Sequence, residues 1–253
     1  VQPFFADTNA GGIGVAHNGN LTNAITLRNK LVQDGAIFYT TSDTETIVQL
    51  IAKSKRGKTI DKIIDAIFQI QGGYALVMMT QNTLIGVRDP YGIRPLVIGK
   101  LKNSYVFASE TCAFDIIGAK FVREVENGEI VSIENNEIKS VKPFPKQKPR
   151  PCIFEYIYFA RPDSILNGKC AYEYRKNFGI ELAKEANVEA DLIVPVPDSG
   201  KCLRAIDGKT NKIVTIQPKW PAGFETSALN LLTSMAGTIE SHGKDKARLD
   251  ELV

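Results

Sequence analysis

The sequence predicts a layered α+β domain, followed by the opening of a second, α/β domain. Three observations lead to this prediction. Helical periodicity lies in residues 22–67, short runs rich in β-branched and aromatic residues occupy 74–141, and a proline-rich stretch at 143–151 separates them from a new strand-and-helix pattern. Helices followed by a block of antiparallel-looking strands are typical of α+β layers rather than of repeating βαβ units.

Three helices are predicted in the first third of the chain. Residues 22–34 carry apolar side chains at helical spacing, and Gly35 stands where that helix would end. Ser42 is the expected N-cap of the second helix, with Glu45 completing a capping box three residues later. The third helix has isoleucines on one side between residues 60 and 67.

Short apolar runs bounded by turn residues predict strands at 74–79, 83–87, 95–98 and 105–108. A hairpin is predicted at 129–141, because two strand-like runs flank Asn135-Asn136. Before the first helix, the glycine-rich run at 11–17 ends in Asn18-Gly19. This pair favours positive φ, so it predicts a tight turn.

Composition excludes several classes of protein. The 253 residues are 43% hydrophobic and 23% charged, which is ordinary for a soluble globular chain. A net charge of +3 without a basic stripe argues against nucleic-acid binding. We find no apolar run of about 18 residues and no signal peptide, so we expect no membrane partner and a cytoplasmic location. Four scattered cysteines without a CxxC pair favour neither a disulfide framework nor a zinc site: Cys112, Cys152, Cys170 and Cys202.

Domain boundaries follow from these patterns. Residues 1–142 form the first domain, and alternating proline and basic residues at 143–151 predict a stiff linker. Residues 152–200 open a second domain, in which we expect a strand at 153–159, a helix at 171–186 and an apolar strand at 191–196. Residues 201–253 match no pattern that we can assign.

Two polar segments could carry chemistry. Hydrolysis of a carboxamide passes through a tetrahedral oxyanion, and each pre-aimed donor to it is worth roughly 3–4 kcal/mol. The Asn18 amide and the Gly19 N–H suit that task, although a plain hairpin turn explains the same residues. Asp43 could receive the α-ammonium group of an amino acid, but aspartate is also common at helix starts.

Taken together and in this order, residues 17–23 (HNGNLTN) and 42–45 (SDTE) resemble the glutaminase domain of class II glutamine amidotransferases, a branch of the N-terminal-nucleophile hydrolases. The resemblance implies that Asn18 and Gly19 form an oxyanion hole and that Asp43 binds the amino group of glutamine. It also implies a four-layer αββα sandwich for residues 1–142.

Longer motifs resemble one branch of that class, the amidophosphoribosyltransferase family. They are DPYGIRPLVIG at 89–99, ASET at 108–111, FEYIYFARPDS at 154–164 and VPVPDS at 194–199. The third resembles the join between glutaminase and phosphoribosyltransferase domains, and it disfavours a sugar-isomerising amidotransferase. For residues 89–99 we expect a structural turn in which Asp89 could pair with Arg94, without a role in chemistry.

The resemblance implies an enzyme that transfers ammonia from glutamine to 5-phosphoribosyl-1-pyrophosphate, giving 5-phosphoribosylamine in the first step of purine biosynthesis. It further implies Mg²⁺ in the transferase half, a homo-oligomer and, in some members, an iron–sulfur cluster. Cys152 is a possible ligand of such a cluster, with a buried structural thiol as the alternative. One thiolate cannot hold a cubane cluster, which takes four ligands.

The chain also departs from the family pattern. The family nucleophile is an N-terminal cysteine, whereas Val1 stands first here, and an arginine that binds the glutamine carboxylate belongs to the same missing stretch. We therefore expect a fragment without glutaminase or synthase activity, without a bound cofactor and with weak affinity for glutamine. The alternatives are a glutamine-binding or subunit-pairing module and a sugar-isomerising enzyme. Because residues 201–253 lack the phosphoribosyltransferase signature, we expect a chimeric, frameshifted or misassembled origin for them.

Overall fold

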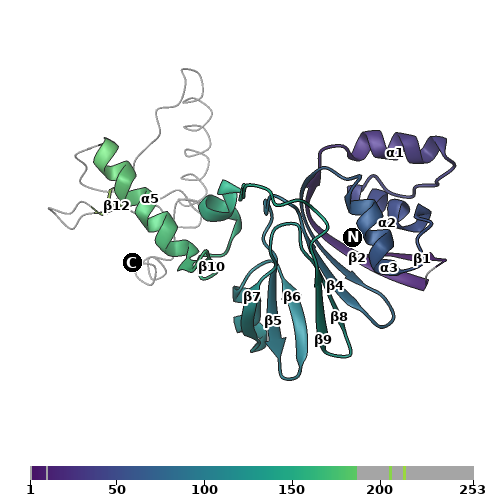
Figure 1. The fold of residues 1–253 in the computed structure, drawn as a ribbon. Helices are drawn as coiled ribbons and strands as arrows, with labels where there is room; N and C mark the ends of the chain where they lie inside the picture. Colours follow the sequence, from purple (N-terminus) through teal and green to yellow (C-terminus); the bar gives the residue numbers. More distant parts are fainter. Residues whose placement is uncertain (1, 10, 187–204, 207–212, 215–253) are drawn as a thin grey trace, which may run out of the picture.

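The computed structural model describes residues 2–9, 11–186, 205–206 and 213–214. The predicted strand at 191–196 lies outside the described residues, as does all of 201–253 except four positions. The described chain consists of helices and two main antiparallel sheets arranged in layers (Figure 1). This arrangement confirms the mixed α+β prediction for the first domain.

A six-stranded antiparallel sheet lies at the centre of the first domain. In spatial order its strands are β1 (Phe4–Thr8), β2 (Gly11–Leu21), β3 (Gly72–Met79), β4 (Leu84–Arg88), β8 (Ile130–Glu134) and β9 (Glu137–Val141). The predicted β8–β9 hairpin is confirmed, because Asn135 and Asn136 have φ of 49° and 62° and form its two-residue turn. Strand β1 was not predicted.

Three helices cover one face of this sheet: α1 (Ala24–Gln33), α2 (Asp43–Lys53) and α3 (Thr59–Ile67). Alternate residues of β2, among them Ile13 and Val15, point into this layer and are buried there with Ile47 of α2 and Ile63 of α3. Burying a full aliphatic side chain contributes about 1.5–3 kcal/mol. The isoleucine periodicity that predicted these helices therefore marks their core-facing sides.

A three-stranded sheet packs on the opposite face, in the order β6 (Ser104–Ala108), β5 (Val97–Leu101) and β7 (Lys120–Glu124). A second apolar cluster lies between the sheets: Ala75, Leu96, Ile98, Val125, Val131 and Ile133. A short helix, α4 (Cys112–Ile117), packs Phe114 so closely on β5 that a Cβ at Gly99 would lie 2.8 Å from the ring. Neither α4 nor β7 was predicted.

The segment after the linker corrects one prediction. Residues 153–159 are helical and end in a wide turn, η1 (Glu155–Phe159), in which the Ala160 N–H donates to the Glu155 carbonyl five residues back. Their aromatic alternation suggested a strand, but no neighbouring strand pairs with them in the described chain. A two-strand hairpin follows, formed by β10 (Ile165–Leu166) and β11 (Lys169–Cys170).

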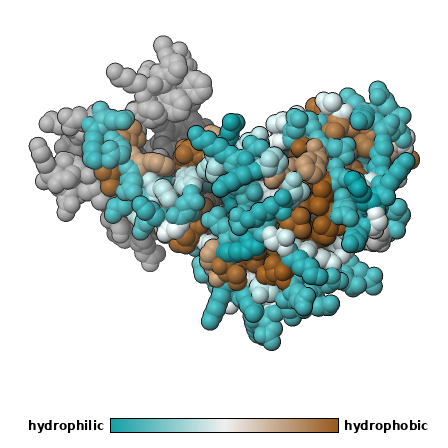
Figure 2. All heavy atoms as spheres, viewed as in Figure 1, coloured by the Kyte–Doolittle hydropathy of each residue, from teal (hydrophilic) through white to brown (hydrophobic). Residues whose placement is uncertain are grey.

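The helix predicted at 171–186 is confirmed as α5 (Ala171–Ala186), and Figure 1 shows it apart from both main sheets. Two short strands, β12 (Ala205–Ile206) and β13 (Ile213–Val214), pair with each other. Hydrophilic residues dominate the face shown in Figure 2, with apolar residues in patches between them. Within the described ranges, no helix has the length and apolar character needed to cross a bilayer.

Candidate functional site

The Asn18-Gly19 pair lies inside a strand and not in a tight turn, which corrects the prediction. Both residues belong to β2 and pair with Ala75 and Tyr74 of β3. Gly19 has a φ of 144°, and a Cβ added to it would lie 2.1 Å from the carbonyl oxygen of Gly73. Glycine is therefore required here for a close approach of two strands, because any side chain would collide with the neighbouring backbone.

The backbone N–H of Gly19 points away from β3. On either side of it, the Leu21 N–H donates to Asp43 Oδ2 over 3.0 Å and the His17 N–H donates to Gln2 Oε1 over 2.6 Å. Alternate residues of an antiparallel strand direct their backbone groups to the same side, so Gly19 shares this direction. The register of β1 with β2 ends at Val15, so no described strand pairs with Gly19 there. Its donor faces an open strand edge.

Asp43 reaches that same edge from the first turn of α2. The predicted N-cap is confirmed, since Ser42 Oγ accepts the Thr44 N–H over 3.2 Å. The predicted capping box is wrong. The Glu45 carboxylate instead accepts the N–H groups of Tyr39 and Thr40, each over 2.8 Å, and so fixes the loop before the helix.

The separation of Asp43 from the Gly19 donor suits an amino acid with a side-chain amide. Asp43 binds the N–H of Leu21, two residues along the strand from Gly19, a rise of about 7 Å. The Asp43 side chain is 22% exposed, and its carboxylate has lone pairs left for an ammonium group. In glutamine, two methylene groups separate the α-carbon from the amide.

His17 lies behind Asp43. Its side chain is 1% exposed, with Nδ1 at 3.4 Å from Asp43 Oδ1 and 3.5 Å from Thr44 Oγ1. Burial lowers the pKa of His17 and outweighs the opposing effect of Asp43, so the imidazole is neutral at pH 7. Because a carboxylate only accepts hydrogen bonds, we assign the proton to Nδ1. The buried Nε2 has no partner within the described part of the chain.

The Asn18 carboxamide is held by two residues that sequence reasoning did not assign to the site. Its Nδ2 donates to Ser109 Oγ over 3.1 Å, and its Oδ1 accepts from Arg94 Nη2 over 2.6 Å. The guanidinium of Arg94 also forms an ion pair with Glu155, with 2.9 Å between Nη1 and Oε1. Ser109 and Arg94 lie in the ASET and DPYGIRPLVIG motifs, so those motifs were the available signal.

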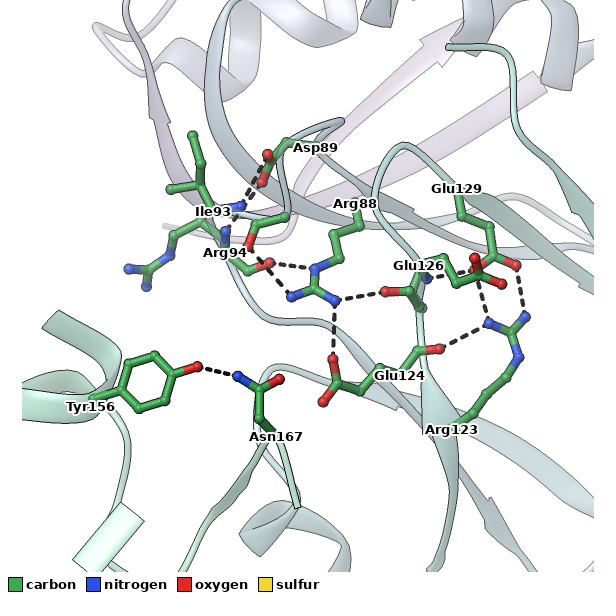
Figure 3. A network of polar contacts seen from close by, with 12 residues as sticks. Arg88, Asp89, Ile93, Arg94, Arg123, Glu124, Glu126, Glu129, Tyr156 and Asn167 are labelled. Atoms are coloured by element: carbon green, nitrogen blue, oxygen red, sulfur yellow. Dashed lines mark hydrogen bonds and ion pairs between the residues drawn. The ribbon is translucent and has the colours of Figure 1, made fainter. Parts of the chain in front are cut away.

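The predicted local pairing of Asp89 with Arg94 is present, but it uses the Arg94 backbone N–H and not the guanidinium. Asp89 is fully buried, and its carboxylate accepts the backbone N–H groups of Tyr91, Ile93 and Arg94 over 3.0–3.1 Å. Figure 3 shows the Arg94 guanidinium directed away from this cluster. The carboxylate therefore shapes the turn between β4 and β5, which frees the guanidinium to reach Asn18.

A wider polar network fixes this turn (Figure 3). The Nε of Arg88 donates to the Arg94 carbonyl over 2.9 Å, and its Nη1 lies 3.2 Å from Glu124 Oε2. Nearby, Arg123 binds the buried Glu129 carboxylate through two hydrogen bonds of 2.8 Å. The backbone of Arg94 is thus held independently of its side chain.

Cys152 is half-buried, and its N–H donates to the Ile93 carbonyl over 3.1 Å. Among the described residues, no group of three or more His, Cys, Asp or Glu side chains could hold a metal ion. The prediction of Cys152 as a cluster ligand stays untested.

Comparison with known proteins gives consistent similarities. Residues 1–115 match the model of the glutamine amidotransferase domain family. The chain is 54% identical over 205 residues to an amidophosphoribosyltransferase of Rhizobium etli, covering 79% of this chain and 41% of the relative. It is 51% identical over 201 residues to the chloroplastic amidophosphoribosyltransferase 1 of Arabidopsis thaliana, covering 79% of this chain and 36% of that relative. This chain therefore spans less than half of each of these relatives.

Solved structures agree with these sequence matches. The glutamine phosphoribosylpyrophosphate amidotransferase of Bacillus subtilis, complexed with ADP and GMP, has a TM-score of 0.77 and 44% identity. The similarity covers 80% of this chain and 45% of that one. A structure described as the allosteric regulatory enzyme of purine biosynthesis has a TM-score of 0.76 and 44% identity, covering 80% and 44%.

Proposed function

Because this chain belongs to the amidophosphoribosyltransferase family, we propose that it carries the glutamine-binding part of an enzyme that transfers ammonia from glutamine to 5-phosphoribosyl-1-pyrophosphate. The product of that reaction is 5-phosphoribosylamine, the first intermediate of purine biosynthesis. One observation carries the proposal for this chain. The Asp43 carboxylate and the Gly19 N–H lie along the same open edge of β2, with the Asn18 carboxamide on the adjoining residue.

Glutamine binds with its α-ammonium group on Asp43 and its side chain extended along β2 toward Gly19. Attack on the amide carbon by a nucleophile places a negative charge on the amide oxygen. The Gly19 N–H and one N–H of Asn18 Nδ2 donate to that oxyanion, and each donor is worth roughly 3–4 kcal/mol. His17 supports the position of Asp43 from the buried side, at 3.4 Å.

The nucleophile is the component that the described residues do not provide at this edge. No hydrogen bond links the described cysteines Cys112, Cys152 and Cys170 to Asn18, Gly19 or Asp43. We propose that the 253-residue polypeptide binds glutamine weakly and does not hydrolyse it. Release of glutamate by the purified chain, but not by its Asp43→Ala variant, contradicts this part.

The second half of the reaction belongs to the segment after the linker. We propose that residues 152–200 open the phosphoribosyltransferase domain, which binds phosphoribosylpyrophosphate with Mg²⁺, and that the whole enzyme is a homo-oligomer. Helix α5 and the similarity to relatives over about 200 residues support this assignment. For residues 1–142 we propose the complete four-layer αββα sandwich, supported by α4 on the outer side of the small sheet.

Shift mapping by NMR tests the proposal, because it detects millimolar binding. Titration of the ¹⁵N-labelled chain with L-glutamine is expected to move the backbone signals of Gly19 and Leu21 and the Asn18 side-chain signals. Asp43→Asn is expected to abolish these changes, whereas Asp34→Asn, which alters an exposed aspartate at the end of α1, leaves them intact. Shifts that avoid β2, or that survive Asp43→Asn, contradict the proposal.

A further inference from the structure

We infer that Arg94 is a positioning residue for the oxyanion donor, and that Glu155 holds Arg94 in place. The guanidinium binds the oxygen of the Asn18 carboxamide, so that the amide nitrogen is directed to where a ligand can accept from it. Glu155 follows the linker in sequence, so a residue of the second segment supports a donor of the first. The inference rests on the proposed function, because that function makes Asn18 a donor.

The orientation of the Asn18 carboxamide follows from its two partners. A guanidinium only donates hydrogen bonds, so the atom that lies 2.6 Å from Arg94 Nη2 must be the acceptor Oδ1. A reversed amide would set two donors against each other and leave both without an acceptor. With Oδ1 on Arg94, the Nδ2 group faces Ser109 Oγ at 3.1 Å. Ser109 Oγ accepts one of the two N–H groups of Asn18 Nδ2, and the second N–H is available to an oxyanion.

The charge of Arg94 also strengthens this donor. Its side chain is 17% exposed, so water screens the guanidinium poorly. A hydrogen bond from a cation to a carboxamide oxygen polarises the amide and makes its N–H groups better donors, as in other hydrogen-bond chains. The positive charge of Arg94, in contact with the far side of the Asn18 carboxamide, also favours negative charge on a ligand bound to Asn18.

Two residues of the helical segment after the linker contact the far side of the guanidinium. Glu155 Oε1 lies 2.9 Å from Arg94 Nη1, and the Glu155 side chain is only 7% exposed. The Phe159 ring centroid lies 5.1 Å from Arg94 Cζ, within the range of a cation–π contact. One planar guanidinium therefore bridges Asn18 and Glu155 with two different nitrogens, which the point charge of a lysine cannot reproduce.

Substitution of Arg94 can be interpreted clearly, because its backbone is anchored separately. The Arg94 N–H donates to Asp89 Oδ2 and its carbonyl accepts from Arg88 Nε, and neither contact uses the guanidinium. Arg94→Met keeps much of the side-chain volume and removes the donors. Arg150→Met is a matched control, because Arg150 is exposed and lies over the Tyr91 ring instead.

The test measures the Asn18 side-chain amide by ¹⁵N NMR in the full 253-residue chain. In the wild type we expect a contact between one Nδ2 proton and Ser109, and slow exchange of these protons with water. Arg94→Met is expected to remove that contact and to speed exchange about fivefold, as for the loss of one hydrogen bond. Arg94→Lys and Glu155→Gln are expected to show the same change to a smaller extent, and Arg150→Met none.

Unchanged Asn18 signals in a folded Arg94→Met chain overturn the inference. Should that variant fail to fold, Glu155→Gln decides in its place, and unchanged Asn18 signals in it count against the inference. Titration with L-glutamine separates this inference from the proposed function. If Asn18 responds to Arg94→Met while glutamine leaves the wild type unchanged, Arg94 still orients the Asn18 carboxamide but the proposed function fails. If glutamine binds and the Asn18 side-chain signals are unchanged in Arg94→Met, the positioning role alone fails.

Discussion

Replacement of Gly19 by alanine gives the most demanding prediction about the site-bearing strand. The new Cβ would lie 2.1 Å from the Gly73 oxygen, and real contacts of this kind essentially never fall below 3.0 Å, so β2 and β3 must separate by about 1 Å. Separation weakens the ladder bonds of the flanking pairs Asn18–Ala75 and Asn20–Gly73, and two to four such bonds contribute about 1 kcal/mol each.

Alanine at a φ of 144° adds backbone strain of about 1–3 kcal/mol. Together these effects lower the free energy of unfolding by about 3–7 kcal/mol, a large share of the 5–15 kcal/mol typical of a domain. Urea unfolding followed by far-UV circular dichroism measures the change. Two matched variants separate its causes. Gly35→Ala has a positive φ but no clash, and Gly57→Ala has neither. A Gly19→Ala chain as stable as Gly35→Ala refutes the close approach of the strands.

Three further predictions concern the surroundings of the site. Ser42→Ala removes the N-cap of α2 and is expected to lower the free energy of unfolding by about 1 kcal/mol in urea, so no change argues against the cap. Burial lowers the pKa of His17 below its ordinary 6.5, so as the pH falls the imidazole is protonated in the unfolded chain before it is protonated in the folded one. The free energy of unfolding therefore falls as the pH drops below 6.5. In the His17→Gln variant, the urea midpoint should fall less steeply with decreasing pH than in the wild type. An equally steep fall would show that His17 does not cause this pH dependence. Arg123→Met leaves the buried Glu129 carboxylate without its two strongest donors and is expected to lower the free energy of unfolding by about 2–3 kcal/mol, measured by thermal unfolding. An unchanged stability means that the two remaining donors to this carboxylate, the Ser140 hydroxyl and the Glu126 N–H, suffice.

Local signals predicted local structure well. The N-cap at Ser42 begins α2, and Asn135-Asn136 forms the hairpin turn, because each depends on neighbours within a few residues. Asn18-Gly19 was misassigned because glycine is equally suited to a turn and to a close contact between strands. The residues that decide between these uses are Gly72 and Gly73, far along the chain.

The candidate site was predicted only in part, for a similar reason. Asp43 and Gly19 were identified from the motifs that resemble glutamine amidotransferases. Arg94 and Ser109 were missed because their contacts with Asn18 span 76 and 91 residues of sequence. The pattern around Arg94 offered the nearby Asp89 as a partner. The four backbone N–H groups that occupy the Asp89 carboxylate became known only from the structure.

A crystal structure of the chain with L-glutamine tests the central claim most directly. The account predicts an α-ammonium nitrogen within about 3 Å of the Asp43 carboxylate and an amide oxygen within about 3 Å of the Gly19 nitrogen. Glutamine bound away from the open edge of β2, or bound to Asp43 with its amide turned away from Asn18 and Gly19, would contradict it.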